Sequence, residues 1–212
     1  MNEINTLIDG FKQYQHQYSE DAEGKYRGMA EYGPHSKILM IACCDSRVDP
    51  AIITNSKGGD LMVIRNIANL VPVYDTASDA YETSAAIEFA ACYLNVSDII
   101  VMGHSRCAGI RSLLTRLLDK SDAVLPLDHW TSVAEPAAKA ALEEMPNADL
   151  DEQSCTCSRK ALAFSLDNLK TYPWVAERLA KNNLTLHGWY FNLATGDLET
   201  YNEDSGSFDS LY

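Results

Sequence analysis

The sequence lacks a long apolar run and an excess of positive charge, and both absences narrow the class of protein. No stretch of its 212 residues approaches the ~20 apolar residues of a membrane-spanning helix. Lys and Arg number 17 against 30 Asp and Glu, which gives a formal net charge of −13. Because nucleic-acid binding draws on clustered Lys and Arg, this balance argues against such a partner. We therefore expect neither a membrane nor a nucleic acid among its partners.

The N-terminal segment also lacks the features of a secretory signal. Residues 1–20 have neither a basic start nor an apolar core. We expect a cytoplasmic protein whose six cysteines stay reduced, which favours metal binding, thiol chemistry or packing over disulfides. A single residue separates Cys155 from Cys157. That spacing suits neither a chelate nor a disulfide, so we interpret both as packing thiols.

The chain contains no internal repeat and no Pro- or Gly-rich linker, which favours one main domain. We expect an N-terminal helical arm over residues 1–30 and a single α/β domain over residues 31–212. The arm is weakly amphipathic, and its apolar positions have no obvious partner within the chain. We therefore expect it to pack on a neighbouring subunit of a homodimer or homotetramer. Its apolar residues are Ile4, Leu7, Ile8 and Phe11.

Strands and helices are predicted to alternate along the main domain. Short apolar runs at 37–42, 61–64 and 98–102 indicate buried strands. Helical spacing predicts a helix over 78–94 and another over 108–118. The fold class is therefore α/β, with a mainly parallel central sheet and flanking helices.

The C-terminal half is predicted to be mostly helical, ending in a hairpin. We expect a helix over 130–144 that begins near Thr131 or Ser132, followed by a polar connection. Two more helices and two strands complete the prediction, the strands forming a hairpin that extends the sheet. The connection covers 147–154, the helices cover 158–170 and 173–182, and the strands cover 184–191 and 198–201.

Two segments rich in chemically reactive side chains follow the first and third predicted strands. CCDSRVDP contains Cys43, and GHSRCAG contains His104 and Cys107. The carboxyl ends of parallel strands form the functional edge of such a sheet, so the two segments should meet. Two thiolates and one imidazole form a tetrahedral zinc set with one vacant position, which is typical of catalysis. Cys44 is disfavoured as a fourth ligand because adjacent side chains in an extended segment point to opposite faces.

The same residues are also compatible with roles other than metal binding. A scattered Cys and His trio is also compatible with packing cysteines and a hydrogen-bonded histidine. Asp45 can approach the metal or its bound water, with Arg47 holding the carboxylate, or it can cap a helix beside a surface Arg47. GHSRC faintly resembles the nucleophile elbow of serine hydrolases, but Cys107 replaces the second glycine.

Four segments of the chain resemble the β-class carbonic anhydrases, and weaker similarity continues through 166–175 and 186–198. They are CCDSRVDP, RNIANLVP at 65–72, SAAIEFA at 84–90, and GHSRCAG. The resemblance implies that Cys43, His104 and Cys107 hold one zinc ion per subunit, with Asp45 and Arg47 as the catalytic dyad. RNIANLVP is more similar to the plant-type branch, which implies an Asp45 that stays paired with its Arg. The chain departs from the family pattern at Pro34, Phe89 and Ala108.

The activity implied by the resemblance is reversible hydration of carbon dioxide to bicarbonate and a proton by a zinc-bound hydroxide. In this scheme Asp45 orients the hydroxide rather than removing its proton. The sequence leaves one close alternative, a zinc hydrolase of carbonyl sulfide or carbon disulfide. Those molecules have a similar shape, and the motifs do not distinguish them.

Overall fold

The computed structural model describes residues 2–20, 28, 31, 35–76, 81–119 and 125–211. The chain divides into two units, Met1–His35 and Ser36–Tyr212. In the first unit, helix α1 spans Glu3–Ser19, and the Asn2 side chain caps it by accepting a hydrogen bond from the Ile4 backbone N–H. No residue of α1 is buried, and its apolar side chains are exposed, including Ile4, Leu7, Ile8 and Phe11.

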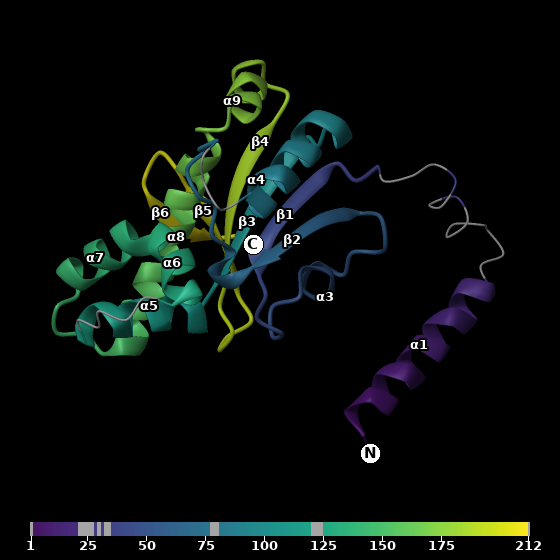
Figure 1. Cartoon of the computed structure of the whole chain (residues 1–212), viewed down its shortest axis with the longest axis horizontal. Helices are drawn as coiled ribbons and strands as arrows, with labels where there is room; N and C mark the ends of the chain where they lie inside the picture. The colour runs from purple at the N-terminus through teal and green to yellow at the C-terminus, as the bar shows by residue number, and fades with distance from the viewer. Residues whose placement is uncertain are drawn as a thin grey trace. The chain divides into compact units, whose positions relative to one another are not determined.

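The second unit is built on a six-stranded sheet in the order β2-β1-β3-β4-β5-β6 (Figure 1). The first four strands in this order are parallel, and the last two join antiparallel. The mainly parallel sheet and its C-terminal hairpin were both predicted, whereas β6 was not. The strands are β1 Ile38–Cys43, β2 Leu61–Asn66, β3 Asp98–His104, β4 Thr185–Phe191, β5 Leu198–Asn202 and β6 Ser207–Ser210.

Helices cover the sheet and extend beyond its carboxyl edge. Side chains of α4, α8 and α9 pack against one face of β1 and β3. Helices α5 and α7 and part of α8 form a second cluster, which includes Cys43 and Cys107 (Figure 1). The helical elements are α3 Pro50–Thr54, η1 Ile67–Asn69, α4 Tyr81–Glu88, the π-helix η2 Phe89–Leu94, α5 Ala108–Asp119, α6 Pro126–Thr131, η3 Ser132–Ala134, α7 Glu135–Glu144, α8 Leu150–Leu169 and α9 Pro173–Ala180.

Two helix boundaries differ from the prediction. The single helix expected over 130–144 is divided into α6, η3 and α7, because Pro136 has no N–H to donate and therefore occupies the first turn of a new helix. The acidic segment expected as a connection begins α8 instead. Asp149 Oδ1 accepts from the backbone N–H groups of Asp151 and Glu152, each at 2.9 Å, and the Asp149 N–H donates to Glu152 Oε2 at 3.3 Å. The predicted helix start at Ser78 lies outside the described residues.

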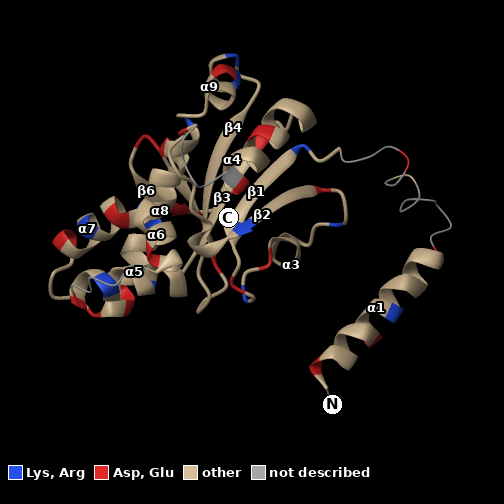
Figure 2. Cartoon of the chain, viewed as in Figure 1, with Lys and Arg blue, Asp and Glu red and all other residues tan. Residues whose placement is uncertain are grey.

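Charged side chains are scattered over helices and loops, and no described element carries Lys and Arg along its whole length (Figure 2). The two arginines of α5 differ in exposure. Arg111 pairs with Asp151 at the surface, but Arg116 is 19% exposed, beside Asp128 and Glu135. Among the helices that the structure describes, none combines the length and apolarity needed to cross a membrane.

Candidate metal centre

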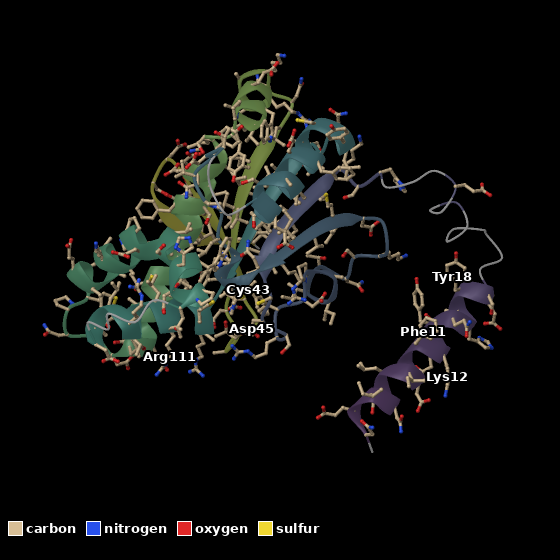
Figure 3. All side chains as sticks on the ribbon, viewed as in Figure 1. Phe11, Lys12, Tyr18, Cys43, Asp45 and Arg111 are labelled. Carbon is tan, nitrogen blue, oxygen red and sulfur yellow. The ribbon has the colours of Figure 1, made fainter. Side chains whose placement is uncertain are left out.

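The carboxyl ends of β1 and β3 bring three metal-ligating side chains together. Cys43 is the last residue of β1, His104 is the last residue of β3, and Cys107 lies in the turn before α5. β1 and β3 are neighbours in the sheet, so Cys43 and His104 end adjacent strands. One ligand atom from each residue lies within 4.8 Å of the others, and all three residues are buried. Figure 3 shows Cys43 and Asp45 at this edge of the sheet.

His104 is oriented to use one particular nitrogen. Its Nδ1 lies 2.9 Å from the carbonyl oxygen of Ser105, to which it donates as an N–H. This bond leaves the Nε2 lone pair free, and Nε2 is buried without a hydrogen-bond partner in the described part of the chain. A buried polar atom without a partner is costly unless a ligand satisfies it. A metal ion bound to Nε2 would satisfy it. The hydrogen bond from Nδ1 would then hold the orientation of the ring, as it does for the histidine ligands of many metal sites.

The two buried thiols are spaced for zinc. Their Sγ atoms are 4.0 Å apart, close to the ~3.8 Å that two Zn–S bonds of about 2.3 Å subtend at the tetrahedral angle. Without a cation only one of them readily ionises. A hydrogen bond from Cys107 lowers the pKa of Cys43, and the same contact raises the pKa of Cys107. A divalent cation would stabilise both as thiolates.

Cys44 takes no part in this group. Its side chain is exposed, whereas that of Cys43 is buried, as the alternation of side chains along an extended segment predicts. Burial raises the pKa of Cys44, so its thiol is less readily ionised than an ordinary cysteine.

Asp45 is held beside the thiols by Arg47. Its Oδ1 accepts from the Arg47 backbone N–H and from Nε, both at 2.9 Å, and its Oδ2 accepts from Nη2 at 2.6 Å. The side-chain bonds from Arg47 hold the pKa of the Asp45 carboxyl well below its usual range. Asp45 is therefore an ionised acceptor with a fixed orientation. Its alternative role as a helix cap is filled by Asp49, which caps α3.

The turn between β3 and α5, in segment 103–109, gives Ser105, Ala108 and Gly109 structural roles. Ser105 is 6% exposed, and its Oγ accepts from the Leu193 N–H at 2.9 Å. His104 Nδ1 bonds the Ser105 carbonyl rather than its hydroxyl, so the serine has no general base in this histidine. A Cβ at Gly109 would lie 2.5 Å from Ile67 Cγ2, whereas Ala108 is exposed and its methyl group is accommodated. Pro34 lies outside the described residues.

Sequence reasoning missed one residue next to the site, Arg65. It sits near the end of β2, and its guanidinium donates to the carbonyl oxygens of Cys43 and Asp45. It also forms an ion pair with Asp49. The sequence signal that could have identified Arg65 is its position. It is a charged residue at the carboxyl end of a predicted strand, and it begins the motif RNIANLVP.

Comparison with known proteins identifies the family. The family model described as carbonic anhydrase matches residues 38–198. Beta carbonic anhydrase 5, chloroplastic, of Arabidopsis thaliana is 37% identical over 88% of this chain, and the match spans 60% of that relative. Carbonic anhydrase of Synechocystis is 34% identical over 92% of this chain and 70% of its own length.

Solved structures agree with the sequence relatives. The β-carbonic anhydrase CcaA superposes with a TM-score of 0.88 at 32% identity, covering 99% of this chain and 100% of that one. One of two β-carbonic anhydrases of Sordaria macrospora, described as tetrameric, superposes with a TM-score of 0.81 at 26% identity, covering 94% and 97% of the two chains.

The chain therefore belongs to the carbonic anhydrases, the zinc enzymes that hydrate carbon dioxide. Within them it is a member of the β class, because its named relatives and the structures that cover nearly its whole length are β-carbonic anhydrases. These relatives do not favour the alternative of a carbonyl sulfide or carbon disulfide hydrolase.

Proposed function

We propose that this chain catalyses reversible hydration of carbon dioxide at a zinc ion bound by Cys43, His104 and Cys107. The observation that carries this proposal is the buried group itself, with three ligand atoms within 4.8 Å of one another and His104 Nε2 unpartnered in the described structure. Zinc held by two thiolates and one imidazole supplies Lewis acidity, which lowers the pKa of a coordinated water. The described residues offer three protein ligands for the zinc ion, the number typical of catalytic rather than structural zinc sites.

Asp45 and Arg47 are proposed to orient the reacting oxygen. An ionised Asp45 is only an acceptor, so it takes a hydrogen bond from an oxygen that still carries a proton and directs that oxygen's lone pair towards carbon dioxide. Arg47 occupies both carboxylate oxygens, which favours a carboxylate that stays paired rather than binding the metal. The contribution of Asp45 is therefore positional, and it requires no proton transfer to the carboxylate.

Ligand variants test the metal assignment. Cys43→Ser and Cys107→Ser each replace a thiolate with a weaker neutral donor and should lose most bound zinc and nearly all carbon dioxide hydration. Cys44→Ser is the matched control, because Cys44 is exposed and outside the group. Zinc per chain is measured by elemental analysis and hydration by stopped-flow. Full zinc content in either ligand variant would overturn the assignment.

Activity assays on the zinc-loaded wild-type protein distinguish carbon dioxide from carbonyl sulfide as the substrate. Carbon dioxide hydration and carbonyl sulfide hydrolysis are measured at equal zinc content, and we expect the first to dominate. Carbonyl sulfide hydrolysis as the faster reaction would reverse the assignment of substrate.

We also propose a homodimer or homotetramer whose N-terminal arm, residues 1–30, packs on a neighbouring subunit. Its support is the apolar side chains of α1, which find no buried position among the described residues of their own unit. The relatives from Sordaria macrospora are described as tetrameric. Deleting residues 1–25 should reduce the oligomeric size in light scattering, and an active truncated protein of unchanged size would contradict the proposed arm.

The proposed compartment is the cytoplasm. A reducing environment suits a site whose proposed ligands include two thiolates, and the described cysteines are all free. One relative is named as chloroplastic, so the test is imaging of the tagged full-length gene product in its native cell. An organellar signal would contradict the proposal.

A further inference from the structure

The loop that follows β1 carries both a proposed zinc ligand, Cys43, and the proposed orienting carboxylate, Asp45. Two backbone bonds shape it. Cys44 N–H donates to the Asn66 carbonyl of β2 at 2.9 Å, and Val48 N–H donates back to the Asp45 carbonyl at 3.1 Å. These bonds leave the carbonyl of Cys43 and the second lone pair of the Asp45 carbonyl available for another donor.

Arg65 supplies that donor from the neighbouring strand. Its Nε donates to the Cys43 carbonyl oxygen at 3.0 Å, and its Nη2 donates to the Asp45 carbonyl oxygen at 2.6 Å. Its Nη1 donates to Asp49 Oδ2 at 2.8 Å. One planar guanidinium therefore bonds at the beginning, middle and end of the loop.

The third bond fixes the guanidinium as well as the loop. Asp49 is divided between two tasks, since its Oδ1 caps α3 by accepting from the Ala51 N–H at 3.0 Å while its Oδ2 holds Arg65. Each nitrogen of the guanidinium has a partner, and the side chain is 28% exposed. Arg65 is thus tied to the fold on one side and to the two functional residues on the other.

We infer that Arg65 is a positioning residue that sets the placement of Cys43 relative to Asp45 by holding both of their carbonyl groups. The inference rests on the proposed function, because it needs Cys43 to bind zinc and Asp45 to orient the reacting oxygen. Arg65 touches neither the thiols nor the carboxylate of Asp45 in these bonds, so it acts through the backbone. A lysine cannot replace it, because a single ammonium cannot reproduce the fixed geometry of three planar donors.

The chain offers a matched control in Arg178. Its guanidinium likewise makes three hydrogen bonds, all of them to backbone carbonyls, those of Ala91, Val96 and Asn183, at 2.6, 2.7 and 2.9 Å. It belongs to α9 and bonds no residue of the metal group or of the loop after β1. Arg178→Lys therefore removes a comparable set of backbone bonds without touching the site.

The experiment compares Arg65→Lys with Arg178→Lys in the full-length protein. Zinc affinity is measured by competition with a chelator, and kcat and KM for carbon dioxide are measured at saturating zinc. We expect both variants to lower the melting temperature. Only Arg65→Lys should weaken zinc affinity, by about tenfold or more, and lower kcat by about tenfold or more with a smaller change in KM.

Zinc affinity and kcat within twofold of wild type in Arg65→Lys would overturn the inference, as would equal losses in Arg178→Lys. If Arg65→Lys does not fold, Arg65→Gln carries the same test, because its amide NH₂ can still bond one of the two carbonyls. A wild-type protein that binds zinc and hydrates no carbon dioxide would refute the proposed function. The zinc affinities of the variants would still decide whether Arg65 positions Cys43.

Discussion

Replacing Arg47 with alanine tests whether orientation of Asp45 limits the reaction. Arg47 gives the Asp45 carboxylate three hydrogen bonds, and alanine keeps only the one from the backbone N–H. The carboxylate should then rotate away from its working orientation. Because outer partners of a metal site typically contribute about 10- to 100-fold, we expect kcat to fall by that factor. Zinc content should stay equal to wild type, since Arg47 makes no bond to the proposed ligand side chains.

The pH dependence separates orientation from protonation. Loss of Arg47 should raise the depressed pKa of Asp45 towards an ordinary value of about 3.9. A carboxyl whose folded pKa is depressed stabilises the fold above its unfolded pKa and loses this contribution as pH falls. Arg47→Ala should therefore be less stable than wild type at neutral pH, and the difference should shrink in acid. At pH 6.5 to 9 the carboxylate is ionised in both proteins. The ratio of wild-type to variant kcat should therefore be constant across that range.

Arg111→Ala provides a control of similar exposure. The side chains of Arg111 and Arg47 are 52% and 51% exposed, and each forms an ion pair with an aspartate. The pair of Arg111 is exposed on both sides and contributes at most about 1 kcal/mol. The Asp45 side chain is only 14% exposed, so Arg47→Ala should unfold at a somewhat lower urea concentration than Arg111→Ala. Stopped-flow hydration should fall only in Arg47→Ala. A wild-type rate in that variant, or a deficit that disappears as pH rises, would refute the orientation role.

Three further predictions concern packing and thiol chemistry. Gly109→Ala should destabilise the protein by about 1–3 kcal/mol in urea titrations, because its Cβ would lie 2.5 Å from Ile67 Cγ2. The control Gly10→Ala should not destabilise the protein, because a Cβ there would have nothing within 4 Å. Burial raises the pKa of the Cys157 thiol from 9.0 to about 12, so its stabilising contribution is present below pH 9 and declines as pH approaches 12. Cys157→Ala should accordingly show a shallower alkaline fall in melting temperature than wild type, and an identical slope would contradict this. Iodoacetamide at pH 8 should label the exposed Cys44 and Cys92 in the zinc-loaded protein. After zinc is removed by a chelator, it should also label Cys43. Labelling of Cys43 before chelation would count against zinc ligation.

The parallel core of the fold could be predicted because short apolar runs and helical periodicity are local signals. The meeting of two motifs at one edge follows from a general rule for parallel sheets, whereas the strand order was not predicted. Pro136 is also a local signal, because a proline favours the first turn of a new helix. The prediction of a single helix over 130–144 overlooked it. The start of α8 was obscured by its acidic composition, because Asp149 and Glu152 resemble a solvated loop until their reciprocal cap is considered.

The site was only partly predictable. Residues with distinctive chemistry, such as Cys43 and His104, are visible as motifs, and the choice of His104 Nε2 depends on the backbone carbonyl that Nδ1 meets. Arg65 is different, because its partners are backbone carbonyls whose directions no side-chain pattern encodes. The burial of Arg116 has the same cause, since Asp128 and Glu135 reach it only after α6 and α7 pack beside α5.

The positions of Cys43 and Cys107, 64 residues apart along the chain, have a consequence for chain topology. A metal ion bound to both would close a covalent-like loop that contains β2, α4 and β3. Closing a loop of that length removes conformational entropy from the unfolded chain worth about 4 kcal/mol in the chain-entropy treatment of cross-links. The ion would then act as a reversible cross-link. The availability of zinc in the cell would set the stability of the folded protein as well as its catalytic rate.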